Sequence, residues 1–212
     1  MEFVADSDRN PFGMDPPCER SVPGYGDTSA HFHVIGDNPA RHGGLDTGIP
    51  FTDRPWSAAF FDALARGGLV EGVDLEAGRL DLDRTFLSYL HMCDPGEGEP
   101  TESDYATLEP FFDAALRAVT AHVLLPVGDR AIEHILATCT SKSATAVDAD
   151  AVHATEVHGS GWLVIPVKEP ATWTDADAEA LAQMLTDLLA SDYRQTADLG
   201  RFLPDEESHL VR

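Results

Sequence analysis

Lysine is nearly absent from this 212-residue chain, whose two lysines are Lys142 and Lys168 and whose formal net charge is −23. A chain of this charge lacks the basic footprint with which proteins usually bind nucleic-acid phosphates. Because multimolar salt shortens the Debye length to about 3 Å and screens self-repulsion, we expect a halophilic protein adapted to a salt-rich cytosol. In such a setting the acidic charge does not exclude a DNA partner. The alternative is an acidic protein of an ordinary cytosol.

Cysteine is scarce, and long apolar runs are missing. Cys18, Cys93 and Cys139 lie far apart and form no C-x-x-C pair, so the sequence indicates neither a disulfide framework nor a zinc site. We therefore expect reduced thiols and no bound metal. No apolar run reaches the roughly 18 residues of a membrane-spanning helix, and the N-terminus lacks the features of a secretory signal. These absences predict a cytoplasmic protein without a membrane partner, which we expect to be a monomer.

The length and an apolar fraction of 43% fit one well-packed domain. Residues 1–30 are rich in Pro, Gly and Asp, which predicts an irregular lead-in. The domain itself is expected over residues 31–191, and residues 192–212 form a polar tail.

Segments with the pattern of strands alternate with segments that have helical spacing. Strands are predicted at 32–35, 85–91, 122–127, 152–157 and 162–167, and helices at 56–66, after Thr101, at 131–137 and after Thr174. This alternation predicts an α/β fold, a three-layer α/β/α sandwich with a mostly parallel central sheet. A ligand crevice is then expected at the carboxyl ends of the strands, in the loops that follow Ile35, Leu90, Val127 and Val167.

The loop over residues 36–52 carries the densest set of functional groups. It is rich in glycine, and Asp37, His42 and Asp46 offer titratable side chains, while Phe51 offers a flat ring. The alternative interpretation is a surface loop whose glycines serve turns and whose phenylalanine belongs to the core.

Several blocks of the sequence occur in the order found in one enzyme superfamily. They are Val22 to Asp27 with Ala30, Val34 to Gly36, Pro39 to Thr52, Leu87 to Pro95 and Leu124 to Arg130. Together they resemble the uracil-DNA glycosylase superfamily, most closely its families four and five, over about residues 18–171. The resemblance implies the fold of that superfamily and a pocket that receives a base extruded from DNA.

The resemblance also implies roles for individual residues. Phe51 matches the aromatic residue on which the base stacks, and Asp37 follows the first strand where a carboxylate orients water or steadies charge on the sugar. The main chain of Gly36, Asn38, Pro39 and Ala40 is expected to line the floor of the pocket. A Phe51 ring turned into the core, or a pocket filled by Tyr89, would argue against this repair interpretation.

Two positions depart from the pattern of the superfamily. Tyr89 stands where family four has the asparagine that reads uracil, and Glu169 stands in place of the histidine of a His-Pro-Ser motif. An ionised carboxylate opposes the negative charge that develops on a leaving base. A protonated Glu169, or a substitute in His42 or His158, would restore a hydrogen-bond donor there.

Family four holds an iron-sulfur cluster on four cysteines, but here two of the four places carry cysteine. Cys18 and Cys93 match those two, and Ser21 and Glu109 match the others, so we expect no cluster and no other cofactor.

The resemblance predicts a DNA-repair glycosylase that hydrolyses the N-glycosidic bond of uracil or another damaged base. DNA contacts would come from main-chain amides and from arginines such as Arg41, Arg54 and Arg194. The alternative is a glycosylase fold without catalytic activity, which binds nucleic acid or a nucleotide.

Overall fold

A computed structural model of the chain describes residues 9–75, 78–140, 147–159 and 161–191. Its centre is a six-stranded sheet with the order β1-β5-β2-β6-β8-β7. The strands are β1 (Tyr25–Gly26), β2 (Phe32–Gly36), β5 (Thr85–Tyr89), β6 (Val123–Pro126), β7 (Val157–His158) and β8 (Leu163–Val164). Strands β5, β2, β6 and β8 are parallel to one another, and the two edge strands β1 and β7 are antiparallel to their neighbours.

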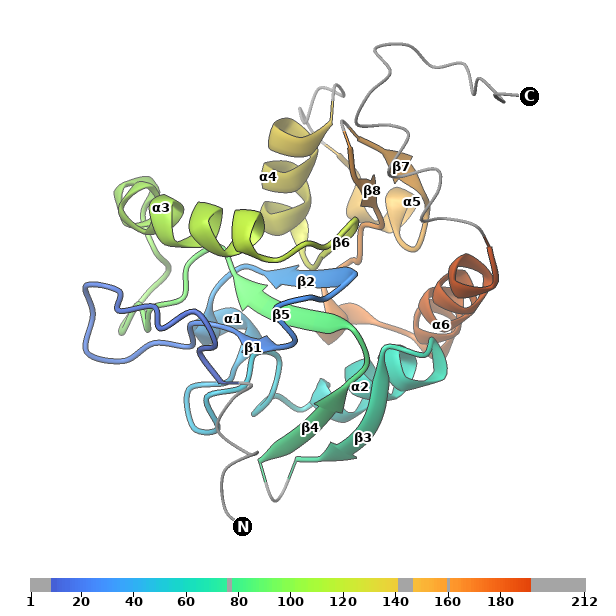
Figure 1. Cartoon of the computed structure of the whole chain (residues 1–212), viewed down its shortest axis with the longest axis horizontal. Helices are drawn as coiled ribbons and strands as arrows, with labels where there is room; N and C mark the ends of the chain where they lie inside the picture. Colours follow the sequence, from blue (N-terminus) through green and yellow to red (C-terminus); the bar gives the residue numbers. More distant parts are fainter. Residues whose placement is uncertain (1–8, 76–77, 141–146, 160, 192–212) are drawn as a thin grey trace.

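Helices cover both faces of this sheet (Figure 1). Helix α2 (Ser57–Arg66) and helix α6 (Asp175–Ala190) pack on one face, and α3 (Glu102–Ala118) and α4 (Asp129–Cys139) pack on the other. Every residue of β2, β5 and β6 is buried, as expected for parallel strands that lie between two helical layers. The predicted three-layer α/β/α sandwich with a mostly parallel sheet is confirmed.

Both long helices begin where the sequence predicts. Thr101 and Asp104 form a reciprocal capping box at the start of α3, and Thr174 and Asp177 form another at the start of α6. Each box satisfies backbone N–H groups that have no partner within the helix.

Three local features differ from the sequence-based expectation. A hairpin of β3 (Val70–Asp74) and β4 (Arg79–Leu82) follows α2, in a stretch where the sequence predicts neither a helix nor a strand. The segment 152–157, expected as a strand, holds the end of the short helix α5 (Ala149–Val152) and only the first residue of β7. Strand β1 lies in the expected lead-in and pairs with β5, so Tyr25 and Gly26 belong to the sheet. Strands of two residues are too short to produce a recognisable periodicity.

The order of the strands locates the crevice. From β2 the chain crosses to β5 on one side and returns to β6 on the other side, so the direction of winding changes at β2. In doubly wound sheets, ligands bind at the carboxyl ends of the strands beside such a change. The loops that follow Gly36, Tyr89 and Pro126 meet there.

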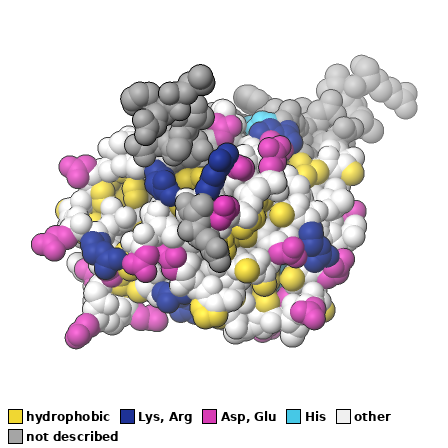
Figure 2. Space-filling model, turned by 90° about the horizontal axis from the view of Figure 1, so that it is seen from below, with side chains coloured by type: hydrophobic (Ala, Val, Ile, Leu, Met, Phe, Trp, Pro, Cys, Tyr) yellow, Lys and Arg dark blue, Asp and Glu magenta, His cyan; other side chains and the backbone are white. Residues whose placement is uncertain are grey.

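Charged side chains are distributed over the surface. Figure 2 shows one face of the molecule, on which acidic side chains lie scattered around a few separate arginine and lysine side chains. No helix in the described part of the chain has the length and apolar composition needed to cross a bilayer.

Candidate functional site

The first part of the site is a tight turn after β2. The Asn38 side chain caps the short helix α1 (Pro39–His42) by accepting from the backbone N–H of Arg41 at 3.0 Å. This turn brings the buried His42 ring back beneath the strand, where its Nδ1 accepts from the Asp37 backbone N–H at 3.0 Å. Because Nδ1 acts as an acceptor, the proton of the neutral imidazole lies on Nε2.

The Asp37 carboxylate lies at the carboxyl end of β2 and is 5% exposed. It accepts a hydrogen bond from the hydroxyl of Tyr105, which projects from the second turn of α3. The side-chain amide of Asn38 donates to the same hydroxyl at 3.4 Å. A buried carboxylate that is hydrogen-bonded at the crevice of the sheet is a suitable group for orienting water or stabilising positive charge.

Phe51 does not form an exposed stacking surface. The residue is 0% exposed, and its ring centroid lies 5.0 Å from that of Phe60, 5.3 Å from Tyr89 and 5.5 Å from His42. Its backbone has φ 67°, a left-handed conformation that is costly for a phenylalanine. Two hydrogen bonds hold this conformation: the backbone N–H donates to the Tyr89 hydroxyl at 2.6 Å, and the carbonyl accepts from the Ser57 hydroxyl at 2.6 Å.

Tyr89 also occupies the niche in which a base was expected to bind. Its hydroxyl also donates to the carbonyl of Gly43 at 3.0 Å, and the whole side chain is buried. A Cβ added at Gly36 would come within 2.8 Å of His42, Tyr89 and Phe51, so the floor of the niche is in direct contact with side chains. The expectation of an open niche faced by Phe51 is therefore wrong for this conformation. Of the segment expected to line the floor, Pro39 is buried and Ala40 is exposed on α1.

Glu169 meets the first turn from the far side of the crevice. Its Oε2 accepts from Arg41 Nε at 2.7 Å and lies 3.3 Å from His42 Nε2. Burial raises the pKa of Glu169, but its hydrogen bonds with His42 and Arg41 and the positive charge of Arg41 outweigh this effect and hold the pKa at about 2. The carboxyl group is thus ionised near neutral pH, and the expectation of a protonated Glu169 as donor is wrong.

The segment that presents Glu169 is anchored by one of the two lysines of the chain. Lys168 Nζ pairs with Asp150 and Asp177, each at 2.9 Å, and thereby ties the segment to α5 and α6. Gly128 makes room for the neighbouring carboxylate, because a Cβ there would lie 3.2 Å from Glu169 Oε2 and the backbone has φ 82°. The site therefore combines residues from the segments that follow β2, β6 and β8 with Tyr89 at the end of β5 and Tyr105 on α3.

His158 lies away from this site. It pairs with Leu163 at the edge of the sheet, and Leu163 pairs with Val123, the first residue of β6. This is the amino end of the parallel strands, opposite the crevice. The His158 side chain is 68% exposed and lies 3.8 Å from Glu156, so the expectation that it substitutes at the site is wrong.

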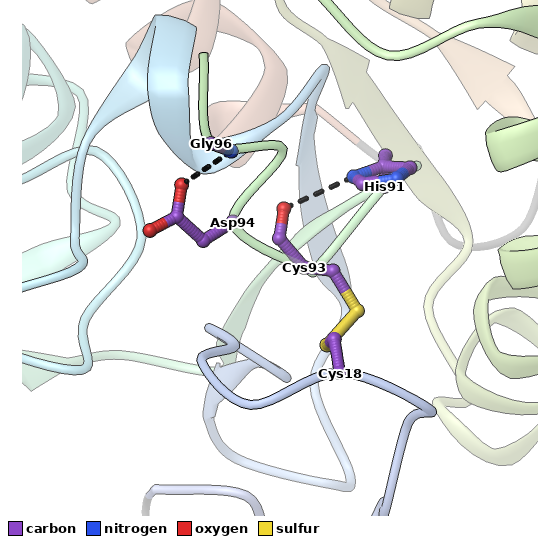
Figure 3. The surroundings of a disulfide bond; sticks show 5 residues. All are labelled: Cys18, His91, Cys93, Asp94 and Gly96. Carbon is purple, nitrogen blue, oxygen red and sulfur yellow. Dashed lines mark hydrogen bonds between the residues drawn. A yellow bond between two sulfur atoms is a disulfide. The ribbon is translucent and has the colours of Figure 1, made fainter.

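Cys18 and Cys93 are joined in a disulfide (Figure 3), so the expectation of reduced thiols is wrong for this pair. Cys139 is free and buried. Ser21 forms a β-bridge with Cys93, so three of the places matched to the cluster do come together. These residues do not fit an iron-sulfur cluster, because the two sulfur atoms bond to each other and the third place carries a hydroxyl. Among the described residues, no group of three or more potential His, Cys, Asp or Glu ligands is found.

The disulfide joins Cys18 to the segment that follows β5, in which Cys93 lies. His91 Nδ1 lies 3.0 Å from the carbonyl oxygen of Cys93, and the His91 backbone N–H donates to the Asp37 carbonyl at 2.9 Å. The ring of His91 also stands edge-on to Tyr105, with centroids 5.4 Å apart. Cys93, which forms the disulfide, is thus two residues along the chain from His91, whose backbone N–H contacts Asp37.

A cavity of about 640 Å³ opens between α3 and α4, and Tyr105 contributes to its lining. Leu90 and Phe112 contribute apolar surface to it, and Arg130 and His134 contribute polar groups.

Two of the arginines expected to contact DNA lie near the turn after β2. Arg41 is partly exposed beside Glu169, and Arg54 donates to the Pro39 carbonyl at 3.2 Å. Arg194 lies outside the described residues.

Comparison with known proteins agrees with this arrangement. The family model of the Uracil DNA glycosylase superfamily matches residues 23–189. The chain belongs to the uracil-DNA glycosylase superfamily. It is 33% identical over 125 residues to the Type-5 uracil-DNA glycosylase of Mycobacterium tuberculosis, a match that covers 58% of this chain and 46% of the relative.

Two further members of the superfamily show how far the similarity extends. The Type-5 uracil-DNA glycosylase of Mycobacterium leprae is 31% identical over 125 residues, which cover 58% of this chain and 54% of the relative. That of Pyrobaculum aerophilum is 27% identical over 184 residues, which cover 85% of this chain and 77% of the relative. The chain thus spans about half the length of the mycobacterial relatives that it matches.

The sequence does not predict two residues of the site, Tyr105 and Lys168. Tyr105 is 68 residues from Asp37, and no motif around it indicates a contact with the first loop. Lys168 stands out in the sequence because lysine is so rare, but its two carboxylate partners become visible only in the fold.

Proposed function

We propose that this chain is a DNA glycosylase that hydrolyses the N-glycosidic bond of uracil or another damaged base in DNA. One observation carries the proposal: the buried Asp37 carboxylate stands at the carboxyl end of β2, where the winding of the sheet changes, and Tyr105 holds it by a hydrogen bond. Membership of the superfamily supports the same reaction.

The proposed reaction exchanges the base for water at the sugar. The bond from C1′ to the base nitrogen breaks and the base leaves with the electron pair. Water adds to C1′ and gives up one proton, and the base takes up one proton. The Asp37 carboxylate stabilises the positive charge on the sugar and orients the water. Arg41 neutralises Glu169 and presents guanidinium N–H groups beside it, so the carboxylate does not face the leaving base as an unpaired charge.

A base can enter the niche only after Tyr89 has moved. This movement breaks the two hydrogen bonds of its hydroxyl, to the Phe51 N–H and to the Gly43 carbonyl. We therefore propose that the free protein is closed and that an extruded base displaces the phenol on binding.

The filled niche also favours a second candidate function. A protein whose Tyr89 and His42 remain in place would bind DNA or a nucleotide without excising a base. The two candidates differ in one measurable property, the formation of abasic sites.

Excision assays on a lesion panel separate the two functions. Purified protein is incubated at high salt with oligonucleotides that carry uracil, hypoxanthine or xanthine, and abasic sites are then cleaved. We expect product from at least one lesion, and a loss of about 100-fold or more in Asp37→Asn, because the neutral amide no longer stabilises positive charge. Asp62→Asn, which makes the same change at an exposed position on α2, is the matched control and should retain full activity. DNA binding without product on every lesion would instead establish the second candidate.

We further propose that the protein works as a monomer in a salt-rich cytosol, where its carboxylate surface is screened. The acidic composition and the scattered charges of Figure 2 support this setting. Circular dichroism in 0.1 M and 3 M KCl tests it on the same sample, with unfolding expected at low salt, and size-exclusion chromatography at 3 M KCl tests the oligomeric state. A fold equally stable at both salt concentrations would refute the salt adaptation. The boundaries of a domain over 31–191 can be tested by limited proteolysis.

A further inference from the structure

The Tyr105 phenol is held by groups from three different parts of the fold. Arg130, at the start of α4, places its guanidinium 4.0 Å from the centroid of the ring. His91, in the segment after β5, stands edge-on to the ring with centroids 5.4 Å apart. The capping box at Thr101 fixes the helix turn from which Tyr105 projects. A side chain restrained on this many sides has little freedom to leave its rotamer.

All of these restraints direct the hydroxyl of Tyr105 to one target, the carboxylate of Asp37. Burial raises the pKa of Tyr105, and its hydrogen bond to Asp37 raises it further, so the phenol keeps its proton near neutral pH and remains a donor. Arg130 is itself held by an ion pair with Glu102. Tyr105 also contributes to the lining of the cavity between α3 and α4.

We propose that Tyr105 is a positioning residue for Asp37: the Tyr105 hydroxyl holds the carboxylate in one orientation toward the sugar. The positioning role rests on the proposed glycosylase function. The two proposals are nevertheless distinct, since excision can occur with a carboxylate that no phenol positions. A misplacement of a catalytic group by 1 Å is sufficient to reduce a rate by about 100-fold.

Tyr105→Phe is the direct test, because it keeps the ring beneath Arg130 and removes the hydroxyl. We expect the single-turnover excision rate at pH 7 to fall by roughly tenfold to 100-fold, while the affinity for DNA and the thermal midpoint change little. A general loss of structure would instead weaken DNA binding and lower the thermal midpoint together with the rate. Tyr25→Phe is the matched control: it removes a buried hydroxyl that donates at 2.6 Å to the carbonyl of Leu80, a residue outside the site, and it should leave the excision rate unchanged.

A second measurement does not depend on activity. Carbon-13 NMR of the tyrosine Cζ atoms follows ionisation of each phenol, and Tyr105→Phe assigns the signal. Since the charge of Asp37 contributes to the raised pKa of Tyr105, Asp37→Asn should lower the pH at which Tyr105 ionises.

The possible failures are distinguishable. Excision by the wild type, with an unchanged single-turnover rate in Tyr105→Phe, overturns the positioning role and leaves the proposed function intact. An unchanged Tyr105 titration in Asp37→Asn overturns the coupling itself. If the wild-type protein excises no base, the proposed function fails, and the positioning role of Tyr105 in that reaction fails with it.

Discussion

Removing the Cys18–Cys93 disulfide should destabilise the protein strongly, because the bond closes a loop of 75 residues. The closed loop contains β1, β2, β5 and helix α2, so the unfolded chain loses much freedom when the bond is present. In the chain-entropy model a loop of this length contributes about 4.5 kcal/mol, and measured contributions are typically about 2 to 4 kcal/mol. We expect Cys93→Ser to lower the free energy of unfolding by about 3 kcal/mol.

Urea unfolding at a fixed high salt concentration measures this change. With an m-value of about 2 to 3 kcal/mol/M, the loss corresponds to a fall of about 1 to 1.5 M in the midpoint. A reductant should lower the wild-type midpoint by a similar amount and leave Cys93→Ser unchanged. Because both substitutions break the same bond, Cys18→Ser/Cys93→Ser should be no less stable than either single variant. Cys139→Ser is the matched control, since it removes a buried thiol outside the bond and should keep its full response to the reductant.

Two results would refute this reasoning. The first is a wild-type midpoint that does not respond to complete reduction. The second is a count of three free thiols in protein that is denatured without reductant, which would show that the bond does not form. The same count on protein trapped with an alkylating reagent in the cell reports whether its compartment allows the disulfide.

Two further predictions concern the closed niche and the Glu169 pair. Tyr89→Phe removes the hydroxyl that joins the Phe51 N–H to the Gly43 carbonyl. Because these buried groups then lack partners, the free energy of unfolding measured in urea should fall by about 2 kcal/mol. A fall of less than about 0.5 kcal/mol would contradict the observed hydrogen bonds. Glu169 has a folded-state pKa of about 2 against 4.5 for the free side chain, so its contribution to stability is present above pH 4.5 and is lost as the pH falls toward 2. Glu169→Gln should therefore be less stable than wild type at pH 7, and this difference should shrink between pH 4.5 and 2; a constant difference over this range would mean that Glu169 is not paired.

The sequence predicts most of the fold because the information is local. The buried runs of β2 and β6 are largely apolar, and β5 has Phe86, Leu87 and Tyr89 beside two small hydroxyl residues. Both capping boxes are visible as a threonine followed by an aspartate three residues later. The hairpin of β3 and β4 was missed because only part of it is buried, so that its strands have no clear apolar pattern.

The candidate site was predicted in part. The position of Asp37 at the end of β2 follows from the order of strand and loop, and the structure places it at the crevice. The exposure of Phe51 could not be predicted, since it depends on whether Tyr89, on β5, and His42, at the end of α1, leave room beside the ring. The ionisation of Glu169 likewise depends on Arg41, which is 128 residues away in the sequence.

The sequence by itself determined the layered α/β architecture, the acidic surface and the loop in which Asp37 lies, because apolar periodicity, charge and glycine content act over short stretches of chain. Only the tertiary structure decided that Cys18 bonds to Cys93, that Tyr105 contacts Asp37 and that Tyr89 closes the niche. These contacts join residues that are 75, 68 and 38 positions apart, respectively. Whether such groups meet depends on how the helices and loops pack over the sheet, which no local pattern of residues specifies.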